Sequence, residues 1–192
     1  MAYGAKNCLV LLHHRPVENS SSNPDWRENS SSSEGGRDYP RVVIQADAAG
    51  ERAKVTAVCW CPVEEGGPQG QSLVSGAEDG VVRMWRWSME TTSLDMVGQH
   101  SVGKGRVTGA SWSKADTGIV MTSDEGGTVA VWDLVTNTNR SLAYSRNTIF
   151  SLACHPDDPD LVAIGCKSGL VLLVSATGVR LCTAWRGAPA WR

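Results

Sequence analysis

Residues 122–132 read TSDEGGTVAVW: the end of one strand, a turn of acidic residues and glycine, and an alternating strand that finishes on Trp132. An alternating pattern is typical of a β-strand with one buried face. A tight turn between antiparallel strands needs a positive φ, which glycine adopts at little cost. The stretch therefore predicts a β-hairpin whose turn depends on Gly127.

The same hairpin pattern occurs three times in the chain. Residues 75–85 read SGAEDGVVRMW and residues 164–174 read IGCKSGLVLLV, and both align with residues 122–132 without gaps. The turn glycines recur about every 45 residues, which is close to the length of one blade in a WD-type β-propeller. The sequence is therefore interpreted as a structural repeat.

Each hairpin is flanked by two further predicted strands. The strands before the hairpins are residues 55–62, 107–113 and 149–156. The strands after them are residues 94–98, 141–145 and 180–184. Four strands per repeat is the pattern of a propeller blade, and a Trp–Asp pair that closes a third strand is the WD signature. We therefore predict an all-β fold: a partial WD40 β-propeller of about three four-stranded blades plus the end of another, in an incomplete ring.

Residues 1–12 match residues 162–173 at a constant offset, so the chain is expected to begin inside the second strand of a blade. The predicted units are a remnant of a first blade at residues 1–15 and 40–47, a disordered insertion at 16–39, WD blades at 53–100, 104–145 and 146–186, and a truncated tail at 187–192. The insertion is rich in Ser, Asn, Gly and charge, and it buries too little apolar surface to offset its ordering entropy. A ring needs about four to eight blades, so we expect a fragment of a longer protein.

Composition and motifs argue against an enzyme, a metalloprotein or a membrane protein. The 192 residues include 18 Lys+Arg and 20 Asp+Glu, so the overall charge gives no general attraction to nucleic acid or membrane. The six cysteines lack the paired spacing of a zinc site, and no phosphate-binding glycine loop, HExxH or GxSxG motif occurs. We expect no catalysis, no cofactor, no metal, no small-molecule substrate and no signal peptide, in a soluble intracellular protein.

Three basic residues fall just before the first strands of successive predicted blades. They are Lys54, Arg106 and Arg146. Because the loops before the first strands share one rim of a propeller, the three cations are expected to form an arc that could hold phosphates without recognising sequence. The alternative is ordinary solvated loop charge, since basic side chains are mostly exposed in any protein.

Two segments of the last predicted blade are more specific than a generic WD repeat: residues 146–154 read RNTIFSLAC, and residues 160–169 read DLVAIGCKSG. Together with residues 1–12, 41–44 and 55–62 in the same order, they resemble the early N-terminal blades of the gem-associated WD-repeat family, whose members are subunits of the survival-of-motor-neuron complex. The resemblance implies a scaffold of the cytoplasm and nucleus that binds small nuclear RNA and supports assembly of the spliceosomal Sm core. The alternative is a generic WD-repeat platform for protein partners, without RNA binding.

The resemblance also implies roles for individual residues. In WD repeats, a His before the first strand, a Ser or Thr in the second strand and a turn Asp form a hydrogen-bonded chain onto the Trp of the third strand. The resemblance places His100, Thr122 and Trp132 in such a chain, with Asp133 completing the WD pair and Trp85 as the counterpart of Trp132 in the preceding blade. A chain of this kind satisfies buried polar groups and rigidifies the blade. The cap-stacking aromatic pair of the family has no equivalent in this sequence.

Overall fold

The computed structural model describes most of the chain between residues 53 and 177. The backbone is described at residues 2–5, 8–13, 41–45, 53–62, 72–88, 91, 93–103, 105–177 and 181–186, and side chains only at those between 53 and 177. The predicted disordered insertion at residues 16–39 and the predicted tail at 187–192 lie outside the described residues.

The described strands form four antiparallel sheets, each with its strands hydrogen-bonded in chain order. The first sheet contains β1 (Ala2–Ala5), β2 (Cys8–His13) and β3 (Arg41–Gln45). The second contains β4 (Val55–Trp60), β5 (Ser72–Ala77), β6 (Val81–Ser88) and β7 (Ser93–Ser101). The third contains β8 (Val107–Trp112), β9 (Ile119–Asp124), β10 (Thr128–Asp133) and β11 (Thr138–Ala143). The fourth contains β12 (Ile149–Cys154), β13 (Leu161–Cys166), β14 (Leu170–Ser175) and β15 (Leu181–Arg186).

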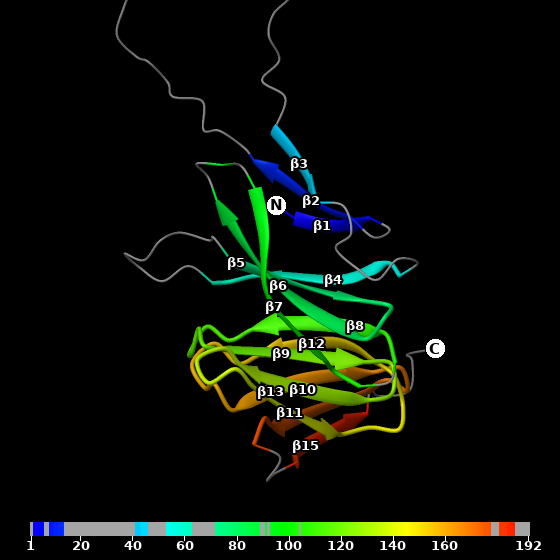
Figure 1. Cartoon of the computed structure of the whole chain (residues 1–192). Helices are drawn as coiled ribbons and strands as arrows, with labels where there is room; N and C mark the ends of the chain where they lie inside the picture. The colour runs from blue at the N-terminus through cyan, green and yellow to red at the C-terminus, as the bar shows by residue number, and fades with distance from the viewer. Residues whose placement is uncertain are drawn as a thin grey trace, which may run out of the picture.

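The sheets follow one another in space as they do in the chain, from the first sheet at the top of Figure 1 to the fourth at the bottom. The first strand β8 contacts both β4 and β12, and β5 and β9 contact the first strand of the next sheet. β1 contacts β4. The structure confirms the predicted all-β fold of three four-stranded sheets in an unclosed propeller.

Every first strand of the four-stranded sheets carries a β-bulge at its second residue. The pairing register shifts at Thr56 in β4, at Thr108 in β8 and at Phe150 in β12. A bulge leaves one residue unpaired and increases the local twist of the strand. Because the irregularity recurs at one position, the three sheets are structural repeats as well as sequence repeats.

The core lies between neighbouring sheets. We call the face of a sheet that packs on the next sheet in chain order its forward face, and the opposite face its backward face. Between the second and third sheets, the buried apolar side chains include Val74, Val82, Val107, Trp112, Val120, Ala130 and Trp132. Between the third and fourth sheets, they include Met121, Val129, Val131, Ile149, Val162, Ile164, Leu172 and Val174. Complete burial of one such side chain stabilises the fold by about 1.5–3 kcal/mol.

The hairpin of the first sheet differs from the expectation. The gapless match to the fourth sheet would pair Tyr3 with Leu11, in the way that Ile164 pairs with Leu172. In the structure, Tyr3 pairs with Val10 instead. The match across this turn is therefore wrong by one residue, and a slip of one residue moves the side chains of a strand to the opposite face.

Three turn glycines adopt the backbone conformation that the sequence predicts. The angle φ is 75° at Gly80, 84° at Gly127 and 77° at Gly169. This left-handed region costs a residue with a Cβ atom about 1–2 kcal/mol. The turn between the second and third strands therefore favours glycine in every four-stranded sheet.

We expect Gly127→Ala to destabilise the fold more than Gly169→Ala. Both variants force alanine into a positive φ, at a cost of about 1–2 kcal/mol. A Cβ at Gly127 would also overlap the backbone carbonyl of Ser145, whereas a Cβ at Gly169 meets nothing within 4 Å. Urea denaturation of the two variants measures the difference, and equal losses of stability would contradict the role given to the Ser145 contact.

Candidate functional site

Each four-stranded sheet brings the residue before its first strand against the turn between its second and third strands. The backbone N–H of Glu78 donates to the carbonyl of Lys54 (2.9 Å), and that of Glu125 donates to the carbonyl of Arg106 (3.0 Å). In the fourth sheet, the N–H of Lys167 donates to the carbonyl of Thr148 (2.8 Å). We call these three junctions the rim.

Two of the rim cations have acidic neighbours. The Glu78 carboxylate accepts a hydrogen bond from the backbone N–H of Lys54 (3.2 Å). The Nε of Arg106 lies 3.3 Å from a carboxylate oxygen of Glu125, and both side chains are about half exposed. An exposed pair of this kind contributes about 0–1 kcal/mol to stability. Its larger effect is to cancel positive charge at the rim of the third sheet.

The fourth sheet has the opposite charge at the same junction. Lys167 occupies the place of Glu78 and Glu125, and its side chain is exposed. Arg146, two residues before Thr148, is also exposed, and neither cation has an ion pair within the described side chains. Positive charge at the rim is therefore concentrated at the fourth sheet.

The predicted arc thus differs in detail from the structure. Lys54 and Arg106 are equivalent, but the residue at their position in the fourth sheet is Thr148 and not Arg146. Lys167 was not among the cations predicted from the sequence, although it aligns with Glu78 and Glu125 in the repeated hairpins. This alignment would have been enough to predict its place at the rim.

In the second sheet, the predicted tryptophan is tied to its own sheet. The buried Nε1 of Trp85 donates to the Oγ of Ser75 at 2.8 Å. Ser75 lies in the second strand, so this bond joins two of the residue types expected in the WD chain. It satisfies an indole N–H that would otherwise be buried without a partner.

The corresponding series of hydrogen bonds does not form in the third sheet. Trp132 donates its Nε1 proton to Oδ1 of Asn137 (3.3 Å), a residue with φ of 52° in the turn after β10. The ring of His100 lies 4.5 Å from that of Trp132 at a tilt of 58°. Both ring nitrogens of His100 and the Oγ1 of Thr122 are buried without a hydrogen-bond partner. The expected hydrogen bonds among these side chains are therefore wrong, and His100 and Trp132 meet through a ring contact instead.

Asp133 caps a turn instead of extending that chain. Its Oδ1 accepts hydrogen bonds from the backbone N–H groups of Val135 (2.9 Å) and Thr136 (3.0 Å). Hydrogen bonding, first of all from Thr136, lowers the pKa of Asp133. The residue therefore closes the turn that ends the third strand, which is a structural role.

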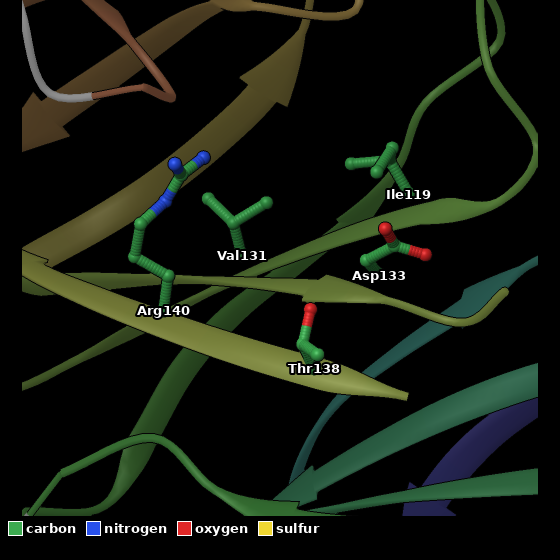
Figure 2. A pocket seen from close by; sticks show the side chains of 5 residues that line it. All are labelled: Ile119, Val131, Asp133, Thr138 and Arg140. Atoms are coloured by element: carbon green, nitrogen blue, oxygen red, sulfur yellow. The ribbon is translucent and has the colours of Figure 1, made fainter. Parts of the chain in front are cut away.

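A small hollow lies on the forward side of the third sheet. Figure 2 shows its lining residues, which are Ile119, Val131, Asp133, Thr138 and Arg140. Its volume is about 250 Å³, below the roughly 300–1,000 Å³ of typical small-molecule pockets. The hollow combines apolar side chains with one acid and one base, and nothing in that set forms a catalytic pair.

Two other kinds of site are absent from the described part of the chain. Among the described side chains, no group of three or more His, Cys, Asp or Glu residues is placed to hold a metal ion. In the part of the chain that the structure describes, no helix is long and apolar enough to cross a membrane.

The repeat and its solved relatives define the class of protein. The family model of the WD domain, G-beta repeat, matches residues 47–86. The fold is similar to a chain in the crystal structure of the mitotic checkpoint complex, with a TM-score of 0.66 and 16% identity over 96% of this chain and 47% of that one. It is also similar to the beta-propeller domain of Myceliophteria thermophila Cps50 (Swd1), with a TM-score of 0.53 and 21% identity over 68% of this chain and 36% of that one. The chain contains a WD repeat and has the fold of an unclosed β-propeller.

Within that class, the sequence is similar to Gem-associated protein 5. The chain is 31% identical over 100 residues to this protein from Mus musculus and from Homo sapiens. The match covers 52% of this chain, which spans 6% of the length of these curated relatives. The predicted resemblance to the gem-associated family is confirmed.

We expect Ser75→Ala to destabilise the protein by about 1–3 kcal/mol, because it leaves the buried N–H of Trp85 unsatisfied. Thr122→Val is the matched control at the equivalent position of the third sheet. Its hydroxyl already lacks a partner, so removing it should be neutral or stabilising. Thermal or urea unfolding measures both changes, and equal losses would contradict the difference between the two sheets.

We expect the stability of the protein to fall between pH 6.5 and about pH 4, partly through His100. Burial lowers the pKa of His100 from 6.5 to about 4. In this interval the unfolded chain binds the proton more readily than the folded chain, so stability decreases as pH falls. His100→Phe keeps a ring against Trp132 and removes the titration. The urea midpoint of this variant should vary less with pH than that of the unmodified chain, and parallel profiles would refute the assignment.

Proposed function

We propose that the chain is a non-catalytic WD-repeat scaffold of the gem-associated type. In this proposal it contacts small nuclear RNA and other proteins of the survival-of-motor-neuron complex, and it supports assembly of the spliceosomal Sm core in the cytoplasm and nucleus. The observation that carries the proposal is the similarity to Gem-associated protein 5 over 100 residues.

The rim supports the RNA part of the proposal. Its junctions lie at one end of the sheets, and strand-to-strand contacts hold those sheets side by side. Lys54, Arg106 and Arg146 remain the proposed contacts, and Lys167 adds a fourth cation. Cations along such a row bind phosphates by releasing counterions, so affinity should fall steeply with salt.

The proposal retains the three blades predicted from the sequence. The proposed blades are residues 53–100, 104–145 and 146–186, and the three four-stranded sheets, which contact one another in chain order, support this division. Trp85 is bonded within its own sheet, His100 and Trp132 pack together between the second and third sheets, and none of the three is proposed to touch a ligand. Recognition is assigned to the rim because it is exposed while the faces of the inner sheets are covered.

A second candidate function is a platform for protein partners without RNA binding. The favouring observation is the mixed charge of the rim, where Glu78 and Glu125 stand beside Lys54 and Arg106. Alternating charges of this kind oppose a uniform polyanion and suit a protein surface of complementary pattern. Salt-dependent binding of RNA separates the two candidates.

We expect the full chain to bind a small nuclear RNA with a single-stranded Sm site, and Lys54→Glu, Arg106→Glu and Arg146→Glu together to weaken this binding. Each lost phosphate contact should reduce the slope of log affinity against log salt by about 0.7. Adding Lys167→Glu should weaken binding further, because Lys167 has no acidic partner within the described residues. Fluorescence anisotropy at several salt concentrations measures both quantities.

Two controls accompany this measurement. Arg140→Glu reverses an exposed charge in the outer strand β11, away from the rim turns, and should leave RNA affinity unchanged. Glu125→Gln removes the acid beside Arg106 and should strengthen binding. No binding at low salt, or equal affinity for all variants, would reject RNA recognition and leave the protein-platform function.

A further inference from the structure

The hollow on the forward face of the third sheet lies at the end of that sheet that is opposite the rim. Strand pairing places Arg140 beside Val131, and it places Ile119 and Thr138 on either side of Asp133. These residues stand where β9 begins, where β10 ends and where β11 begins. The rim turn connects the other ends of β9 and β10. A ligand in the hollow would therefore not compete with a ligand at the rim.

The base of the hollow is apolar and belongs to the core between the third and fourth sheets. Val131 is 7% exposed, and Ile119 packs against the same core cluster. That cluster includes Val162 and Val174 of the fourth sheet, so the base is held from both sides. Close packing fixes such side chains in position. The hollow therefore offers a preformed apolar surface at the seam between two sheets that lie inside the chain.

The two charged residues of the hollow differ in whether they are already bonded. The Asp133 carboxylate accepts hydrogen bonds from the backbone N–H groups of Val135 and Thr136. The exposed guanidinium of Arg140 forms no ion pair with any described side chain. Residues 178–192, which follow the last described side chain, contain no Asp or Glu. Arg140 is therefore the charged group of the hollow that is open to an external anion.

The nearest acid of the fourth sheet is bonded within its own sheet. Burial raises the pKa of Tyr144, the charge of Asp160 raises it further, and the charge of Arg140 lowers it, so both charges lie near this hydroxyl. The Asp160 carboxylate accepts hydrogen bonds from the hydroxyl of Ser175 and the backbone N–H of Thr177. It forms no ion pair with Arg140. A carboxylate that binds Arg140 closely would therefore be supplied by another molecule.

We propose that this hollow docks an extended segment of a protein partner that carries a carboxylate close to an aliphatic side chain. The planar fork of Arg140 matches a carboxylate in two parallel hydrogen bonds. The aliphatic side chain would rest on Ile119 and Val131, and Asp133 would repel a second acid at the other end. Figure 2 shows Arg140 and Asp133 on opposite sides of Val131. The volume of about 250 Å³ is smaller than typical small-molecule pockets, and it suits single side chains of a protein.

This inference rests on the scaffold part of the proposed function and does not depend on RNA binding. The test measures fluorescence polarisation of blocked, labelled peptides with the full chain. Each peptide carries one glutamate and one leucine, at a different spacing, in a glycine–serine background. We expect at least one spacing to bind. Replacing its glutamate by glutamine should weaken binding by roughly tenfold, through loss of a charge-assisted hydrogen bond.

Variants of the chain assign the binding to the hollow. Arg140→Gln should remove the preference for the glutamate peptide over the glutamine peptide. Arg140→Glu should prefer a peptide with lysine in place of glutamate, because the charges are then exchanged. Arg146→Gln is the matched control: Arg146 is also exposed, but it lies near the rim, so peptide affinity should not change. Far-UV circular dichroism verifies that each variant is folded.

RNA affinity, measured with the same variants, separates this inference from RNA recognition at the rim. Arg140→Gln should weaken only peptide binding, and Arg146→Gln only RNA binding. Absence of peptide binding up to about 1 mM overturns the docking proposal. Equal affinity for the glutamate and glutamine peptides also overturns it, as does equal weakening by Arg140→Gln and Arg146→Gln. Peptide binding that persists in a chain without RNA affinity supports the hollow and rejects only the RNA part of the proposed function.

Discussion

The structure depends on the contact between the forward face of each sheet and the backward face of the next. Gly76 shows how close that contact is, since even one added carbon would overlap Val107 of the following sheet. Dispersion and hydrophobic burial act over contact distances, so this approach excludes water and gives the interior its density. The same packing places the first strands side by side, and it thereby arranges the rim turns in one row.

The buried polar groups differ in whether they have hydrogen-bond partners. The indole N–H of Trp85 donates a hydrogen bond to Ser75. The equivalent hydroxyl of Thr122 has no partner, and the indole N–H of Trp132 donates to Asn137. His100 adds two buried nitrogens without hydrogen bonds, and its burial lowers the pKa of the imidazole from 6.5 to about 4. Unsatisfied buried groups of this kind cost stability, and only the surrounding apolar contacts offset them. The interface between the second and third sheets is therefore more sensitive to acid than its apolar composition suggests.

The rim derives its properties from pairs of residues far apart in the chain. The backbone carbonyl of the residue before each first strand accepts a hydrogen bond from a turn residue about 20 positions later. The charge of that turn residue sets the net charge of the junction. Glu125 pairs with Arg106, Glu78 accepts a hydrogen bond from the backbone N–H of Lys54, and Lys167 brings a positive charge to the junction of the fourth sheet. Among the described side chains, positive charge at the rim is therefore greatest at the fourth sheet, where Arg146 and Lys167 are both exposed.

The sequence by itself determined the repeat, the strands and the turns. Period-two alternation and the requirement for positive φ at Gly80, Gly127 and Gly169 are local properties, so they can be recognised without knowledge of the fold. The tertiary structure was needed to show which residues contact one another. In it Tyr3 pairs with Val10, the indole N–H of Trp132 donates to Asn137, Thr122 has no hydrogen-bond partner, and Lys167 lies at the rim. The reason is physical: register, burial and the field around a charge depend on which distant segments come into contact, and a local pattern does not contain that information.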